Sequence, residues 1–156
     1  MSITMTTHDD RAARTEAVRA LEGEFGDLIT KFRRLIAQNA ERLSPGLLPG
    51  AYKVFTTIVR HESVTLSTLA DMLIMDKGQL SRTVRELEHL GLVQRSPDPE
   101  DGRASLLSPT PVGLERLAVA RAPQQNSLHE ALEDWPLEDI EHLARLLRAM
   151  SGLADS

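Results

Sequence analysis

Apolar residues recur in steps of three and four along most of this chain, which is the spacing of one face of an α-helix. The first such stretch runs from about residue 11 to residue 42, and the Pro- and Gly-rich segment SPGLLPG, residues 44–50, ends it. Its apolar positions follow the a/d spacing of a heptad repeat; they are Val18, Leu21, Phe25, Leu28, Phe32 and Leu35. The same spacing predicts further helices over residues 51–61, 66–73, 77–90, 111–134 and from 137 onward.

Capping residues mark where several of these helices begin or end. Thr65 is the predicted N-cap of the 66–73 helix, and Gly91 is the predicted C′ residue after the 77–90 helix. Thr110 and Pro111 form an N-cap followed by a proline at the first helical position. Pro123 lies inside the helix that starts there. We expect Pro123 to kink or divide that helix, because proline lacks an N–H and clashes with the preceding turn.

Two short segments, residues 92–96 and 103–108, predict β-strands, and the segment between them is rich in Pro, Asp and Gly, as a hairpin loop would be. Two short helices joined by a tight turn and followed by a hairpin form a winged helix-turn-helix, which places one helix in a DNA groove. The sequence therefore predicts a mainly α fold with a small β-hairpin, in which a winged helix-turn-helix over residues 51–109 is flanked by N- and C-terminal helices.

The predicted 77–90 helix has an apolar face and a basic face, and no carboxylate occurs among residues 77–85. Arginine can pair with guanine and glutamine with adenine in the major groove, and glycine lets the backbone approach the sugar-phosphate closely. A plain amphipathic helix with a solvated basic face is the alternative. The residues predicted to face DNA are Lys77, Gly78, Gln79, Ser81, Arg82 and Arg85.

Three hydroxyl side chains, Thr65, Ser67 and Thr68, stand at the start of the 66–73 helix. Hydroxyl and free backbone N–H groups at a helix start can hold a DNA phosphate. Simple N-capping is the alternative, and the two roles are compatible.

Composition changes this picture only in part. The formal net charge is -5 and the pI is about 5.5, which argues weakly against a nucleic-acid partner, although the local distribution of charge decides what a surface binds.

The absence of cysteine excludes disulfides and thiolate chemistry, and no apolar run approaches a membrane span. The histidines have no metal-ligand spacing, and P-loop, GxGxxG and nucleophile-elbow motifs are absent. We therefore expect a cytoplasmic protein that is not an enzyme and holds no cofactor.

Residues 65–117 resemble the MarR family of bacterial transcriptional regulators. The resemblance rests on LSRTVRELEHLGLVQR followed by DPEDGRA and LSPTPVG, with long helices on either side. It implies a homodimer that binds a palindromic operator in double-stranded DNA, usually as a repressor. It also implies that residues 77–90 are the recognition helix and that residues 93–108 are the wing.

The resemblance assigns roles to two wing residues. Arg103 occupies the position of the wing-tip arginine that enters the minor groove, and Asp101 the position of the aspartate that orients this part of the wing. The chain departs from the family at Gly102 and Ser105, where relatives often carry basic residues. We therefore expect this wing to bind DNA phosphates less tightly than the wings of those relatives.

On this reading, residues 1–10 are a flexible tail and residues 11–156 form a single MarR-like domain, in which residues 11–42 and 111–153 are dimerisation helices. A second copy would cover the apolar stripes that these helices expose. Many relatives release DNA when a small aromatic or amphipathic ligand binds. Tyr52, Arg60 and His61 are candidates to line such a cleft, the alternative being a core tyrosine beside two solvated side chains. A second function left open is a winged-helix protein-interaction module without specific DNA binding.

Overall fold

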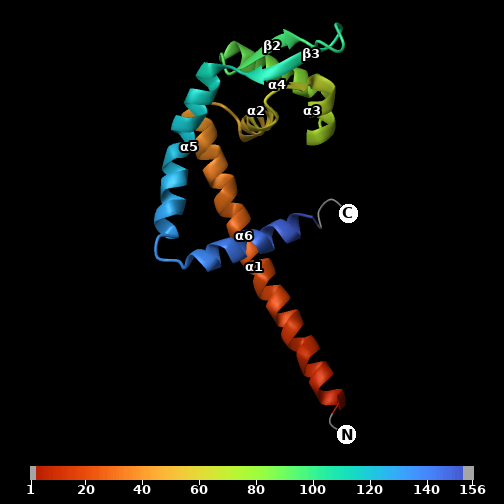
Figure 1. Cartoon of the computed structure of the whole chain (residues 1–156), viewed down its shortest axis with the longest axis vertical. Coiled ribbons are helices and arrows are strands. Elements are labelled where there is room, and N and C mark those ends of the chain that lie inside the picture. The colour runs from red at the N-terminus through yellow and green to blue at the C-terminus, as the bar shows by residue number, and fades with distance from the viewer. Residues whose placement is uncertain (1–2, 153–156) are drawn as a thin grey trace.

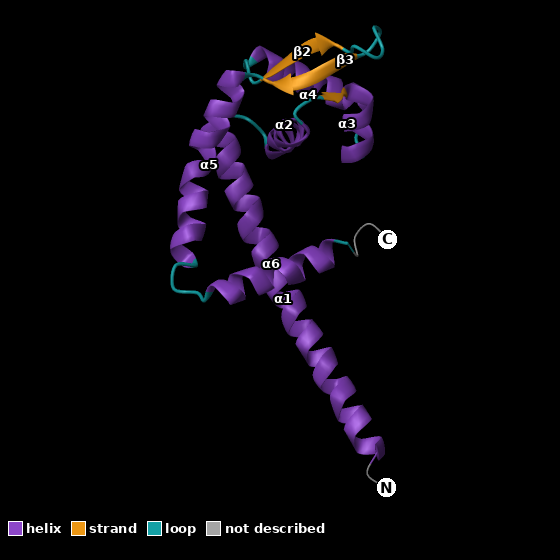
Figure 2. Cartoon of the chain, in the orientation of Figure 1, coloured by secondary structure: helices purple, strands orange, loops and turns teal. Residues whose placement is uncertain are grey.

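The computed structural model describes residues 3–152, with side chains from residue 9 onward. The winged domain lies at one end, the long helices α1 and α5 extend from it, and α6 turns back from the far end of α5 (Figures 1 and 2). The helices are α1 (Ile3–Leu43), α2 (Pro49–His61), α3 (Leu66–Leu73), α4 (Lys77–His89), α5 (Pro111–Ala131) and α6 (Leu137–Ser151). The strands are β1 (Val64–Thr65), β2 (Val93–Pro97) and β3 (Ser105–Pro109).

The strands form an antiparallel sheet in the order β1-β3-β2, so the predicted hairpin gains a third strand. β2 pairs with β3 so that Arg95 lies opposite Leu107, and β1 pairs Val64 with Leu107. The two residues of β1 are too few to show the alternation that marks a strand in a sequence. The predicted class, mainly α with a winged helix-turn-helix, is confirmed.

The core of the winged domain is aliphatic and is centred on α2. Phe55 and Ile58 of α2 are fully buried together with Leu80 and Leu87 of α4 and Leu107 of β3. Because these residues come from three separate elements, the apolar face of α4 is fixed against the core and its opposite face is left to solvent.

The three predicted caps are all present. Thr65 accepts a hydrogen bond from the N–H of Thr68 at 3.2 Å, and Thr110 accepts one from the N–H of Gly113 at 2.9 Å. Gly91 has φ +75° and follows α4 in the left-handed conformation that glycine adopts without strain. These caps fix where α3 and α5 begin and where α4 gives way to the wing.

Two predictions about the helices were wrong. Residues 3–10 belong to α1, which begins at Ile3 instead of near residue 11, because no proline or glycine before Gly23 stops the helix. Of the expected kink or division at Pro123, the division is contradicted, because α5 runs unbroken from Pro111 to Ala131. The next residue, Gln124, accepts a hydrogen bond from the buried Asn39 of α1, and this tie holds α5 against α1 where the proline removes one backbone bond.

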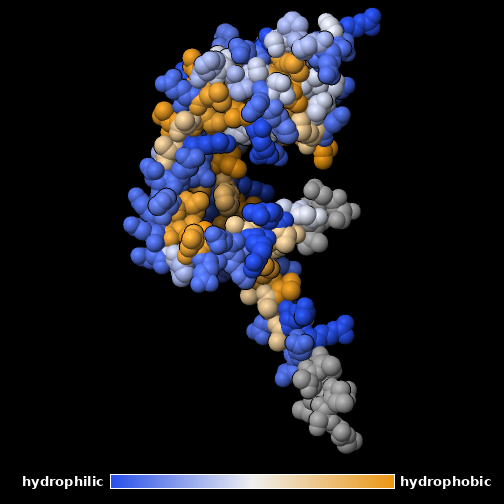
Figure 3. Space-filling model, viewed as in Figure 1, coloured by the Kyte–Doolittle hydropathy of each residue, from blue (hydrophilic) through white to orange (hydrophobic). Residues whose placement is uncertain are grey.

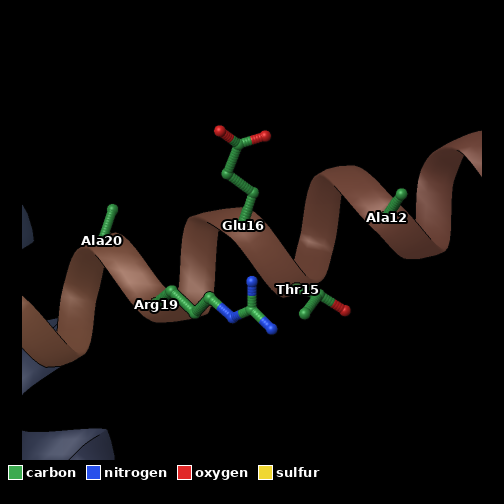
Figure 4. Close-up of a pocket in the computed structure, with 5 residues that line it drawn as sticks. All are labelled: Ala12, Thr15, Glu16, Arg19 and Ala20. Carbon is green, nitrogen blue, oxygen red and sulfur yellow. The ribbon is translucent and has the colours of Figure 1, made fainter.

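Both terminal helices carry apolar stripes that lie at the surface. On α1, Val18, Leu21 and Phe32 are each almost half exposed, and α6 has no buried residue. Apolar side chains gather where α5 turns into α6 and along α1 (Figure 3). The opposite face of α1 is small and polar, with Thr15, Glu16 and Arg19 lying between alanines on this one helix (Figure 4).

Within residues 3–152, no helix is long and apolar enough to cross a membrane.

Candidate nucleic-acid interface

The exposed face of α4 carries most of the residues that the sequence predicts to face DNA. Lys77, Gln79, Arg82 and Arg85 are exposed, whereas Ser81 is half-buried. Of the residues that the structure describes, only Arg95 and Glu88 form an ion pair. Lys77, Arg82 and Arg85 therefore form no ion pair with any described carboxylate, which leaves their side chains available to phosphate or to base edges.

The start of α4 is already capped, which the sequence pattern did not indicate. Asp76 is the N-cap, and its carboxylate accepts a hydrogen bond from the N–H of Gln79 at 3.0 Å. The same carboxylate oxygen lies 3.0 Å from the place where a Cβ on Gly78 would be. Gly78 therefore leaves room for the cap, and the negative charge of Asp76 reduces the attraction of this helix start for phosphate.

The start of α3 presents hydroxyl groups in two different states. The Thr65 hydroxyl donates to Thr68 Oγ1 at 2.9 Å and accepts from the Thr68 N–H, so its hydrogen is used within the helix start. Ser67 is exposed, and its hydroxyl makes no hydrogen bond to any other described residue. The hydroxyls of Ser67 and Thr68 can therefore still donate to an incoming group.

The wing tip is organised by aspartate side chains bonded to the backbone. Asp101 Oδ1 accepts from the N–H of Arg103 at 3.1 Å, and Asp98 Oδ1 accepts from the N–H of Glu100 at 2.9 Å. The Asp98 N–H donates to the carbonyl of Ala104 at 3.1 Å and closes the loop. The carboxylates therefore shape the turn while the guanidinium of Arg103 stays exposed.

A hollow of about 350 Å³ brings the wing and the start of α3 together. Thr65 of β1 and Ser67 of α3 line it on one side, and Asp101 and Arg103 line it from the wing. Thr68 and the exposed residues of α4 do not line it. The residues predicted from the sequence thus divide into two groups, one on the exposed face of α4 and one around this hollow.

Arg95 was missed by the sequence pattern. It lies on β2, lines the same hollow and forms an ion pair with Glu88 in the last turn of α4. The signal for it is the strand register: Arg95 lies opposite the buried Leu107, so its side chain is directed to the face of the sheet that the helices cover.

Tyr52, Arg60 and His61 differ in their exposure. Tyr52 is buried, and its hydroxyl accepts a hydrogen bond from Arg121 Nε at 3.2 Å, whereas Arg60 and His61 are exposed. No group of three His, Asp or Glu side chains suited to a metal ion occurs among the described residues.

Comparison with known proteins agrees with this geometry. The MarR family model matches residues 47–105. An uncharacterized HTH-type transcriptional regulator of Mycobacterium bovis is 32% identical over 100 residues, covering 64% of this chain and 70% of its own. The chain belongs to the MarR family. This MarR protein is therefore a DNA-binding transcriptional regulator and not an enzyme.

Two further relatives extend the match over most of the chain. The uncharacterized regulator YxaD of Bacillus subtilis is 26% identical over 126 residues, covering 80% of this chain and 88% of its own. The crystal structure of a mutant MarR from Escherichia coli complexed with operator DNA has a TM-score of 0.56 at 25% identity, covering 82% of this chain and 91% of that one. The likeness of this MarR protein to its relatives thus extends well beyond the residues that the family model matches.

Proposed function

We propose that this MarR protein is a homodimeric repressor that binds a palindromic operator. The single observation that carries the proposal is the exposed face of α4, where Lys77, Arg82 and Arg85 have no acidic partner among the described side chains. The similar structure from Escherichia coli is a complex with operator DNA. In our proposal, α4 enters the major groove and the Arg103 side chain enters the adjacent minor groove.

The proposed contacts are of two kinds, those to base edges, which select the sequence, and those to the DNA backbone, which do not. Gln79, Arg82 and Arg85 contact base edges. Lys77, Gly78 and Ser81 lie along the sugar-phosphate backbone of the DNA. Ser67 and the capped pair of Thr65 and Thr68 hold a phosphate, and Asp101 fixes the turn that carries Arg103. These assignments follow from the exposure and hydrogen bonding of each side chain, and each can be tested by substituting the residue.

The homodimer accounts for the apolar stripes. Residues 11–42 and 111–153 are the proposed dimerisation helices, because Leu21 and Phe32 of α1 and Leu147 of α6 are exposed in the single chain. Two-fold symmetry would set the two α4 helices about one turn of DNA apart and match a palindromic operator. Residues 51–109 then form the DNA-binding part, with the wing at residues 93–108.

Release by a small aromatic or amphipathic ligand stays a prediction. The buried Tyr52, bonded to Arg121, lies between α2 and α5 and gives a ligand no exposed aromatic ring. A thermal-shift screen would identify aromatic acids that raise the melting temperature. Each of these acids would then be tested for release of operator DNA from the protein.

The test of the main proposal is a mobility-shift titration with DNA from the protein's own promoter region. Arg82→Ala should weaken operator binding by about 1–3 kcal/mol and relax its specificity. Arg19→Ala, an arginine on the polar face of α1 (Figure 4), is the matched control and should bind as wild type.

Salt separates DNA binding from the alternative of a protein-interaction module. Operator affinity should fall steeply between 50 and 200 mM salt, because phosphate contacts release counterions. Affinity for the promoter no better than for random DNA would contradict the proposal. Repression itself is tested by deleting the gene, which should raise transcription from the operator-bearing promoter.

A further inference from the structure

An ion pair joins the recognition helix to the wing. Arg95 Nε donates to Glu88 Oε1, and about a third of each side chain is exposed. Glu88 stands one residue before the end of α4, and Arg95 is the third residue of β2. The pair therefore links two elements that we propose contact DNA in different grooves.

The pair lies where the hairpin leaves the core. Val93 at the start of β2 and Leu107 of β3 are buried, and Arg95 lies opposite Leu107 on the same face of the sheet. Beyond Arg95, Ser96 and Pro97 are exposed. Among the described residues, this ion pair is the one side-chain hydrogen bond or ion pair between α4 and the hairpin.

The hairpin also borders a hollow, which Arg95 itself lines. The hollow of about 350 Å³ separates the wing residues Arg103 and Ser105 from Ser67 at the start of α3. No packed side chain fills this hollow to support the wing. A two-stranded hairpin is marginally stable without such packing, so its direction depends on the few contacts at its base.

We propose that Glu88 and Arg95 are positioning residues that hold the wing at a fixed place relative to α4. The inference rests on the proposed function, because it concerns how the two DNA-binding elements act together. With the wing fixed, Arg103 reaches DNA without first losing conformational freedom, and the binding of α4 and of the wing reinforce each other. Arg95 acts here through Glu88 and the hairpin, and not as a base-reading residue.

The sign of the Glu88 effect distinguishes positioning from simple charge. Glu88 adds a negative charge to the helix that faces DNA, so electrostatics alone predicts tighter binding when that charge is removed. Positioning predicts weaker operator binding. Glu86, an exposed carboxylate on the same helix with no ion-pair partner among the described residues, supplies the matched control.

The experiment measures operator affinity by fluorescence anisotropy for the full chain and for Glu88→Gln, Arg95→Gln, the double variant and Glu86→Gln. We expect Glu88→Gln and Arg95→Gln each to weaken binding about two- to fivefold, the range of an exposed ion pair. The double variant should bind no worse than either single variant, since one interaction is lost in all three. Glu86→Gln should bind as tightly as wild type or tighter.

Two further measurements separate positioning from loss of fold. The charge-exchanged variant Glu88→Arg with Arg95→Glu should recover at least half of the loss in binding free energy. Hydroxyl-radical footprinting should show weaker protection of the minor groove at the wing in Glu88→Gln, while protection of guanine N7 from dimethyl sulfate in the major groove by α4 is kept. A misfolded variant would lose both kinds of protection.

Three results would overturn the inference: Glu88→Gln binding at least as tightly as wild type, additive effects of the two single variants, or equal loss of both footprints. Failure of the wild-type chain to bind promoter DNA specifically would contradict the proposed function as well. Specific wild-type binding that is insensitive to Glu88→Gln would contradict the positioning role alone.

Discussion

The Oδ1 atom of Asp101 accepts a hydrogen bond from the backbone N–H of Arg103 at 3.1 Å. The carbonyl of Asp101 also accepts from the N–H of Ala104 at 3.0 Å, so this aspartate closes the turn at the wing tip. The carboxylate therefore acts on the backbone that carries Arg103 and makes no ion pair with its guanidinium within the described structure.

Asp101→Ala tests this relationship. Removal of the acceptor should loosen the turn and weaken operator binding by about 1 kcal/mol, although the substitution makes the wing less negative. Asp101→Asn keeps an oxygen acceptor and removes the charge, so it should bind at least as tightly as wild type. Both affinities are measured by anisotropy, and tighter binding by Asp101→Ala would contradict the role in the turn.

Gly113 should tolerate no side chain. A Cβ at this position would lie 2.5 Å from the carbonyl oxygen of Leu92 and 3.1 Å from the ring of Phe55. Gly113→Ala should lower the free energy of unfolding by about 1–3 kcal/mol, the range for an overpacked core. Gly23→Ala in α1, where nothing lies within 4 Å of the new Cβ, is the control and should raise helix stability by about 0.5–1 kcal/mol. Thermal and urea unfolding measure both, and equal behaviour would contradict the close packing.

Ile74 should be replaceable with a gain in stability. It ends α3 with φ 51° and ψ 49°, a left-handed conformation that disfavours a β-branched residue, and 93% of it is exposed. Ile74→Asn should raise the free energy of unfolding by about 1 kcal/mol, since asparagine adopts this conformation more readily and no burial is lost. Ile74→Val keeps the branched Cβ and should leave the stability unchanged. A destabilised Ile74→Asn would indicate that the exposed isoleucine side chain has a partner.

Leu21→Glu should separate the proposed dimer. Leu21 lies in the apolar stripe of α1 and is 47% exposed in the single chain, so a buried carboxylate would be placed in the interface. Sedimentation should show a monomer at concentrations where wild type is a dimer, with operator affinity reduced at least tenfold. Ala12→Glu introduces the same charge nine residues earlier, at a position labelled in Figure 4, which the helical period places on the opposite face of α1, and should stay dimeric.

The emission of Trp135 gives a second readout of that dimer. Trp135 is the single tryptophan, is 47% exposed and lines an apolar hollow of about 500 Å³ where α5 turns into α6. Coverage by a second copy should move the emission maximum to shorter wavelength as the protein is concentrated. An emission maximum that does not change while sedimentation shows dimers would place the interface elsewhere.

Features set by neighbouring residues could be read from the sequence. Thr65, Gly91 and Thr110 cap the helices as predicted, because a cap depends on the side chain and backbone of one short segment. The exposed face of α4 was also predictable, since a helical period of 3.6 fixes which residues lie opposite the buried Leu80 and Leu87.

Features that depend on contacts between separate elements could not be read in this way. The strand β1 is two residues long and exists because β3 pairs with it. The ion pair of Arg95 and Glu88 depends on how the hairpin turns back over α4, and the tie between Asn39 and Gln124 joins residues 85 positions apart. The roles in DNA binding of the predicted residues stay predictions, because exposure makes contact feasible but does not choose a partner.

The carboxylate of Asp76 at the start of α4 has a consequence for how such a regulator would search a chromosome. Random genomic sequence offers at least a million competing sites, to which phosphate attraction alone gives some affinity. An acidic cap at the leading end of the recognition helix, in a chain of net charge -5, lowers that background attraction. Fewer molecules would then be held away from the operator, so a small number of copies per cell would suffice to occupy it.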